Sequence, residues 1–352
     1  MTLICALRAQ ADTCARMGSP FTGRVLTCLA DTWSPDTRLA HDLAAYQGDI
    51  GPSGHSLPLR LAAGLHALVR QNLDAHLVAA YPPHDVDDAT LQKAIVNALK
   101  THEDHLCEWT RLPPQTNEVR RSAALIAMAH VACTYFDRPL VLSELGASAG
   151  LNLMWDRFAL NISGDMWGPR DAALTLTPTW DGPPPPKSFP QVVDRSGVDL
   201  NPLNAQAPGD LLRLTSYLWA DQPERLKLTL AAASVACAQV EKGDAINWLS
   251  DRLQNTPTGY MHIVQHTVAW QYFPAEAQKR GQALIEAAGA AATTDTPLAW
   301  MQMEADTDTA ALGGAALTLR LWPGDITLRL GRADFHGRWI RWAAPGQQTA
   351  AM

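Results

Sequence analysis

The chain has 352 residues, a formal net charge of −7 and a hydrophobic content of 47%. Its length can bury a large core and suggests two domains, or one domain with an elaborate extension. The acidic balance argues against a polyanionic partner, since nucleic-acid binders usually carry a basic face. No apolar run approaches the roughly 18 residues that a membrane helix needs. We therefore expect a cytoplasmic protein with neither a nucleic-acid nor a membrane partner.

The six cysteines and eleven histidines form no sequence pattern typical of a metal site. The cysteines are scattered without a C-x-x-C pair, which indicates reduced structural thiols. His102 and His105 lie near Glu103 and Asp104, but this group is expected on the polar face of a helix. We therefore predict no metal site.

The N-terminal third of the chain shows apolar residues at helical spacing and no convincing strand up to residue 138. We predict an all-helical subdomain over residues 1–114, followed by a helix that begins near Val119 after a Pro-Pro break. The polar residues at its start could simply cap the helix, with the arginines exposed to solvent, or they could form a binding site. However, this helix leads directly into the next strand, so its start could reach a ligand there. The polar residues are Gln115, Asn117, Glu118 and Arg121.

Residues 139–156 predict a buried strand, a tight turn and a helix. Residues 140–142 form the apolar run of a strand that is buried on both faces of a parallel sheet. Gly146 and Gly150 bracket a turn of small residues. A backbone of this kind can approach a ligand closely, and its N–H groups can hold polar atoms.

Two chemistries share this local sequence. Glu144 and residues 146–150 resemble the acidic-x-Gly-x-Gly-x-Gly loop of class I S-adenosylmethionine-dependent methyltransferases, with Ser148 in place of the middle glycine. The same five residues match G-x-S-x-G, the strained elbow that exposes a nucleophilic serine in α/β-hydrolases. A plain strand-to-helix turn in any α/β protein would also account for them.

Acidic residues follow the next two predicted strands. Asp199 ends a strand that begins near Gln191, after an inserted hairpin and loop over residues 158–190. Asp244 stands between a short strand and the helix that begins at Ala245, which it could simply cap. At the end of a Rossmann-like strand, a carboxylate in the place of Asp199 accepts hydrogen bonds from the ribose of a nucleotide.

The last third of the chain predicts further strands and a hairpin. Residues 260–268 predict a strand whose end carries Gln265 and His266. Strand ends line ligand crevices in open α/β sheets, so we expect His266 to face a pocket. A helix and a strand over residues 297–304 follow. Residues 315–330 alternate around a Pro-Gly turn, which predicts an antiparallel hairpin.

Three segments resemble a bacterial family catalogued as domain of unknown function 2332. They are residues 115–120, residues 144–153 with Asp156 and Arg157, and residues 195–202. This resemblance spans nearly the whole chain and implies no activity. A looser resemblance, over about residues 139–330, is to class I S-adenosylmethionine-dependent methyltransferases, in which an antiparallel hairpin closes an otherwise parallel sheet.

The methyltransferase resemblance implies an α/β fold with a Rossmann-like, mostly parallel sheet over residues 115–352, and S-adenosylmethionine as cofactor. The implied cofactor contacts are Glu144, Gly146, Ala147, Ser148, Gly150, Asp199, Asp244, Ala245 and Gln265. A small polar or acidic substrate would meet Gln115, Asn117, Arg121 and Asn152. The bases would be His266 and Glu118.

Two other classes of function stay open. A serine hydrolase would need Ser148 with a later acid and a later histidine. Chain order allows Asp199 or Asp244 as the acid and His262, His266 or His336 as the base. Hydrolases place strands and an H-G-G-G-type loop before the elbow, whereas this region is predicted to be helical. A non-catalytic nucleotide-binding or scaffold protein would carry the same loop, and the sequence determines neither substrate nor oligomeric state.

Overall fold

The computed structural model describes residues 2–51, 54–254 and 258–344. The chain divides into two compact units, of which the first contains residues 1–116 and 207–227 and the second contains residues 117–206 and 228–352. The sequence predicted a boundary after residue 114. It did not predict that residues 207–227 return to the first unit.

The first unit is helical, as the sequence predicted. Its helices are α1 (Leu3–Arg16), α2 (Pro20–Thr32), α3 (Arg38–Ala44), α4 (Leu57–Arg70), α5 (Ala75–Ala80), α6 (Asp88–Thr101), α7 (Glu103–Arg111) and α9 (Pro208–Ser216). Several helices begin where a side-chain oxygen accepts a first-turn amide, the usual N-cap. These caps are Thr2, Ser19, Thr37, Asp74 and Asp87.

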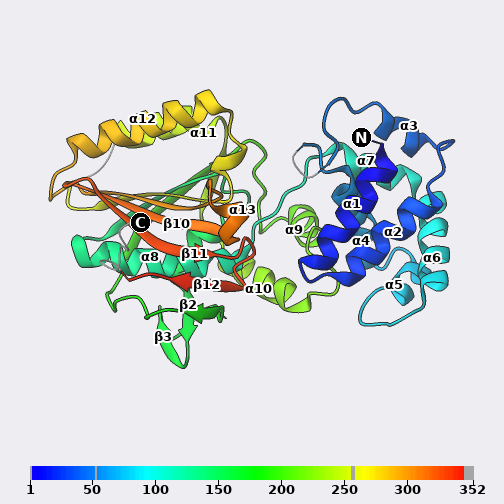
Figure 1. Cartoon of the computed structure of the whole chain (residues 1–352), viewed down its shortest axis with the longest axis horizontal. Helices are drawn as coiled ribbons and strands as arrows, with labels where there is room; N and C mark the ends of the chain where they lie inside the picture. Colours follow the sequence, from blue (N-terminus) through cyan, green and yellow to red (C-terminus); the bar gives the residue numbers. More distant parts are fainter. Residues whose placement is uncertain (1, 52–53, 255–257, 345–352) are drawn as a thin grey trace. The chain divides into compact units, whose positions relative to one another are not determined.

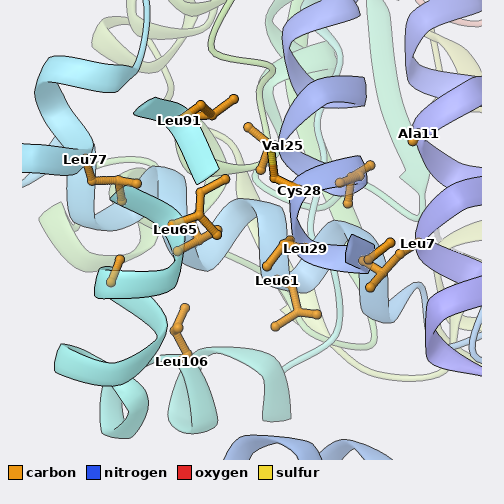
Figure 2. Packing of buried hydrophobic residues seen from close by; sticks show 14 of the residues in the cluster. Leu7, Ala11, Val25, Cys28, Leu29, Leu61, Leu65, Leu77, Leu91 and Leu106 are labelled. Carbon is orange, nitrogen blue, oxygen red and sulfur yellow. The ribbon is translucent and has the colours of Figure 1, made fainter. Parts of the chain in front are cut away.

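Leucines from different helices make up much of the core of the first unit. Figure 2 shows such side chains converging, among them Leu7, Leu29, Leu61, Leu65 and Leu106, all of which are fully buried. Each buried leucine contributes about 1.5–3 kcal/mol relative to an exposed one. The helical spacing of these residues in the sequence therefore reports the face that each helix buries.

The second unit is built on a nine-stranded sheet. Its strands are β1 (Leu140–Leu145), β5 (Thr179–Asp181), β6 (Val192–Asp199), β7 (Gln239–Lys242), β8 (Met261–Thr267), β9 (Leu298–Glu304), β10 (Ala315–Trp322), β11 (Ile326–Ala333) and β12 (Trp339–Trp342). Their order is β5-β12-β11-β10-β9-β8-β1-β6-β7. The strands from β9 to β7 are parallel, whereas β10 and β11 form the predicted antiparallel hairpin beside β9. The fold is thus mixed α/β with a mostly parallel sheet.

Helices cover both faces of this sheet (Figure 1). α11 (Ala245–Gln254) and α12 (Ala275–Ala291) pack together on one face, and α8 (Ser122–Tyr135) lies on the other. Residues 122–133 of α8 are all buried, as expected for a helix that is apolar on every side. The other helices are α10 (Pro223–Ser234) and α13 (Thr309–Leu312). Within the described ranges, no helix has both the length and the apolar content to cross a membrane.

The segment predicted as an insert, residues 158–190, forms a small sheet of its own and also joins the large one. β2 (Phe158–Ile162), β3 (Asp165–Trp167) and β4 (Leu174–Leu176) form a three-stranded sheet of order β3-β2-β4. β5 instead pairs in parallel with β12 at the edge of the main sheet. The sequence did not predict β5, because a strand of three residues carries too little periodicity to be recognised.

Gly289 in α12 tests how tightly this helix packs on the sheet. A Cβ at this position would overlap the indole ring of Trp322, which is itself buried. We expect Gly289→Ala to lower the free energy of unfolding by about 1–3 kcal/mol, because overpacking outweighs the gain of about 1 kcal/mol in helix propensity. Denaturant unfolding of the full chain measures this change.

Ala287→Gly is the matched control, since Ala287 is an exposed residue of the same helix. It reports helix propensity alone and should cost about 1 kcal/mol. A Gly289→Ala variant that is stabilised by a similar amount would show that α12 does not pack on Trp322 in this way.

Candidate functional site

The loop after β1 is attached to the end of β6. The amides of Gly146 and Ala147 donate to the carbonyl of Val198 at 2.9 and 3.0 Å. The amide of Ser148 donates to Oδ2 of Asp199 at 2.9 Å. The sequence predicted that these amides could hold ligand atoms, but they are engaged within the protein. A ligand at this loop would therefore meet its small side chains.

The loop is both sharply turned and closely packed. Gly146 and Gly150 have φ of +70° and +69°, which glycine adopts without strain. Ser148 also has a positive φ, of 53°, which is uncommon for a residue with a Cβ. A Cβ at Gly146 would lie 2.7 Å from the Cβ of Ala269. Gly146 is therefore required by packing against the loop after β8 as well as by its own conformation.

The polar segment before α8 reaches this loop. Oδ1 of Asn117 accepts the amide of Leu151 at 2.8 Å, where the 3-10 helix η2 (Leu151–Arg157) begins. Ser122 in the first turn of α8 donates its hydroxyl to Oδ1 of Asn152 at 2.8 Å. The sequence left open whether Asn117 caps the helix that follows it. Asn117 instead satisfies the start of η2, a helix that is distant in the sequence.

Glu144, at the end of β1, carries a buried carboxyl group. The residue is 2% exposed, and Oε2 has no hydrogen-bond partner among the described residues. Burial raises the pKa of Glu144 to about 8, although a hydrogen bond from Gln265 and the charge of Arg121 act in the opposite direction. The carboxyl is therefore mostly protonated at neutral pH.

Gln265, at the end of β8, connects Glu144 to η2. Its Oε1 accepts the indole N–H of Trp155 at 3.1 Å, and its Nε2 donates to the carbonyl of Asn152 at 3.3 Å. Gln265, Trp155 and Asn152 are all buried. The side chain of Gln265 thus fixes the position of η2 relative to the Glu144 carboxyl.

Two charged residues before α8 are held in place nearby. Arg121 donates to the carbonyls of Phe335 and Thr267 at 2.8 and 3.0 Å. Glu118 is buried, and its Oε1 accepts the amide and the Nε–H of Arg120 at 3.2 and 3.0 Å. The roles of Arg121 as an anion ligand and of Glu118 as a base stay predictions.

Asp199 and Asp244 lie at the ends of neighbouring parallel strands. The amide of Gly243 donates to the carbonyl of Asp199 at 3.0 Å, which brings the two acids together. Oδ1 of Asp244 accepts the amides of Ile246 and Asn247 at 3.1 and 2.8 Å. Asp244 therefore caps α11, as the simpler interpretation of the sequence held. Its carboxylate nevertheless lies at this edge of the sheet.

His266 belongs to a buried network. Its Nδ1 lies 2.7 Å from Oε1 of Glu304, and its Nε2 accepts the indole N–H of Trp300 at 2.9 Å. The proton of the neutral ring is therefore on Nδ1. The same Glu304 oxygen accepts the amides of Ala269 and Trp270. The sequence predicted His266 as a base that faces a pocket. Both of its ring nitrogens have partners within the protein, which argues against this role but does not test it.

Several residues of the site were not singled out in the sequence: Ser122, Trp155, Trp300 and Glu304. Glu304 carries the same signal as Gln265, because it ends a predicted strand. Trp155 carries a weaker signal, since a buried tryptophan usually needs an acceptor for its N–H. The sequence contains no indication that these particular residues are partners.

Two further sequence predictions concern Gln115 and metal binding. Gln115, which was predicted to contact the substrate, belongs to the first compact unit, and Asn117 begins the second. The role of Gln115 stays a prediction. No metal site was predicted. In the part of the chain that the structure describes, no group of three or more His, Cys, Asp or Glu residues could hold a metal ion.

Comparison with known proteins assigns the chain to a family. A family model described as "Uncharacterized protein conserved in bacteria (DUF2332)" matches residues 5–342. The chain belongs to this family. No curated protein and no solved structure matches the chain. The DUF2332 match spans both compact units, as the motifs in the sequence predicted.

Glu144→Gln tests whether the buried carboxyl of this DUF2332 protein is protonated. The pKa of Glu144 is about 8 in the folded protein, against an ordinary value of 4.5. The folded state therefore binds a proton that the unfolded state releases, and wild-type stability should fall as the pH rises between these values. The wild type should lose up to about 1.4 kcal/mol of unfolding free energy per pH unit through this group, whereas the variant has no carboxyl there to titrate. The free energy of unfolding of the variant minus that of the wild type should therefore increase with pH. Denaturant titrations at several pH values measure this difference.

Glu286→Gln is the control. Hydrogen bonds from Gln282 and Arg320 lower the pKa of Glu286. Its carboxylate is therefore charged in both states above about pH 5, and the same difference should be flat up to about pH 8. A flat difference for Glu144→Gln as well would contradict a protonated Glu144.

Proposed function

We propose that this protein is an S-adenosylmethionine-dependent methyltransferase that acts on a small polar or acidic molecule. The observation that carries the proposal is the Oε2 atom of Glu144, a buried carboxyl oxygen without a hydrogen-bond partner among the described residues. Leaving such an atom unsatisfied costs about 1–3 kcal/mol. A ligand that supplies the missing hydrogen bond would remove this cost.

The strand order supports a ligand site at the same place. The parallel strands follow one another in the chain as β1, β6, β7, β8 and β9, but lie side by side as β7-β6-β1-β8-β9. The direction of sheet growth therefore reverses between β1 and β8. In open α/β sheets, ligands bind outside the carboxyl ends of the strands at such a switch point. Glu144 and Gln265 are register partners across it.

The residues at this edge fit the cofactor. Residues 146–150 would lie against its methionine part, whose ammonium would meet Glu144, and Asp244 would lie near the adenine. Asp199 would accept the ribose hydroxyls. Its Oδ1 accepts the backbone amide of Asn201 at 2.8 Å, and its Oδ2 accepts that of Ser148 at 2.9 Å, which holds the carboxylate in place at the strand end. The cofactor supplies a methyl group on a sulfonium when bound.

The substrate side would be formed by residues that precede and follow the loop. Arg121 would attract an anionic group, and Asn152 would offer its amide. His266 cannot take a proton on Nε2 without losing the bond from Trp300. We therefore assign His266 the role of positioning the loop after β8 through Glu304, and Glu118 the role of base.

Calorimetry with the full chain tests the proposal. S-adenosylmethionine and S-adenosylhomocysteine should both bind. Asp199→Asn should weaken both about ten- to a hundredfold, because a hydrogen bond to a charged group contributes about 1.5–3 kcal/mol.

Asp194→Asn makes the same change at the other end of β6, where Asp194 pairs with Arg252 at 2.9 Å, and should leave the affinity unchanged. Asp199 also holds the amide of Ser148. Thermal unfolding of the ligand-free variants therefore checks that the loop is retained. Absence of binding to the wild type, or undiminished binding to Asp199→Asn, would refute the assignment.

The alternative is a serine hydrolase with Ser148 as nucleophile. The positive φ of Ser148 favours it, because nucleophile elbows are strained. Two of the three candidate histidines, His262 and His266, argue against it. Nε2 of His262 lies 2.8 Å from the hydroxyl of Ser143, and burial lowers the pKa of His262 to about 4. His266 is held at both nitrogens.

A fluorophosphonate probe distinguishes the two functions. Under conditions that label a known serine hydrolase completely, we expect peptide mass spectrometry to find no adduct on Ser148. An adduct formed in one-to-one ratio on the wild type and absent from Ser148→Ala would favour the hydrolase instead.

A further inference from the structure

A cavity of about 400 Å³ lies within the second unit, where the insert and α8 meet. Small-molecule sites have volumes of about 300–1,000 Å³. Most of the wall is aromatic or aliphatic, which favours a planar apolar ligand. The apolar wall residues include Ile126, Trp155, Phe158, Met166, Trp167 and Pro169.

Two residues of the cavity wall, Trp167 and His130, carry hydrogen-bond donors. Trp167 is 3% exposed, and its indole N–H has no acceptor among the residues that the structure describes. Nδ1 of His130 accepts the amide of Ser188 at 3.0 Å, so the proton of the neutral ring is on Nε2. Burial lowers the pKa of His130 to about 4, which keeps the ring neutral at pH 7. A ligand here would have to bring an acceptor.

The charges around the cavity favour an anion over a cation. Both carboxylate oxygens of Asp156 are bound by Arg195, which neutralises the acid on the wall. Nζ of Lys187 lies 5.1 Å from the centre of the Trp167 ring and 3.6 Å from Oδ1 of Asp165. The side chains of Lys187 and Asp165 are 61% and 71% exposed. Such a pair is weak, so the ammonium can turn to a ligand.

We propose that this cavity binds a planar apolar molecule that carries a carboxylate or a similar anionic acceptor. Its rings would lie among Trp155, Phe158 and Trp167, and its acceptor would meet the Trp167 N–H and Lys187. The inference does not depend on the proposed methyltransferase function. Trp155 lines the cavity and donates its N–H to Gln265, so it links the cavity wall to the Glu144 site.

Two fluorescent probes of the same shape separate the apolar part of this recognition from the anionic part. They are 8-anilinonaphthalene-1-sulfonate and N-phenyl-1-naphthylamine, which lacks the sulfonate. The sulfonate should bind the folded full chain in one-to-one ratio. Trp167→Phe keeps a ring but removes the donor, and should weaken the sulfonate about tenfold or more. Lys187→Met should weaken it about two- to fivefold and leave the neutral probe unchanged.

Trp167→Phe has a second readout in the absence of any probe. It removes a buried donor that lacks an acceptor, so the ligand-free protein should keep or raise its unfolding temperature. Trp180→Phe is the matched control in the insert, because the N–H of Trp180 donates to the carbonyl of Pro183 at 3.2 Å. This control should not raise the unfolding temperature and should leave the binding of both probes unchanged.

Lys242→Met controls for the loss of a surface lysine, since Lys242 is exposed on β7 and does not line the cavity. Near-UV circular dichroism checks that each variant retains its packing. The proposal is overturned if neither Trp167→Phe nor Lys187→Met changes the affinity for the sulfonate. It is also overturned if the wild type binds several sulfonate molecules with one weak affinity.

Discussion

The attachment of the β1 loop to the end of β6 is the constraint from which the candidate site follows. The carbonyl of Val198 and the carboxylate of Asp199 accept three consecutive loop amides. Oδ1 of Asn117 accepts the amide of Leu151, at the start of η2. With the backbone fixed in this way, η2 places Trp155 on Gln265. The Glu144 carboxyl is then enclosed by side chains that are themselves held by hydrogen bonds.

Departures from the usual rules of local structure occur at this edge of the sheet, as they do elsewhere in the described part of the chain. Ser148 follows β1 and Val268 follows β8, and both have φ of 53°. This conformation is especially unfavourable for a β-branched residue such as Val268. Oε2 of Glu144 and Oε2 of Glu304 are buried without hydrogen-bond partners in the described part of the chain. Strain and unsatisfied polar groups persist where the surrounding structure holds them, and they cluster at functional sites.

The sequence predicted elements well where the pattern is local and long enough. The helical N-terminal region, the β1 strand and the β10–β11 hairpin are examples, because periodicity and turn residues specify each of them. β5 and the return of residues 207–227 to the first unit depend on partners distant in the chain. For the site, polar residues at strand ends such as Asp199 and Gln265 could be predicted. Their hydrogen bonds could not, because only tertiary structure decides whether Asn117 caps its own helix or η2.

The central claim is that the carboxyl edge of β1, β6, β7 and β8 holds a nucleoside cofactor. A crystal structure of the full chain grown with saturating S-adenosylhomocysteine tests this claim most directly. Our account predicts ribose hydroxyls on the carboxylate of Asp199 and the homocysteine ammonium within hydrogen-bond distance of Glu144. An empty edge, or the ligand bound elsewhere, would contradict it.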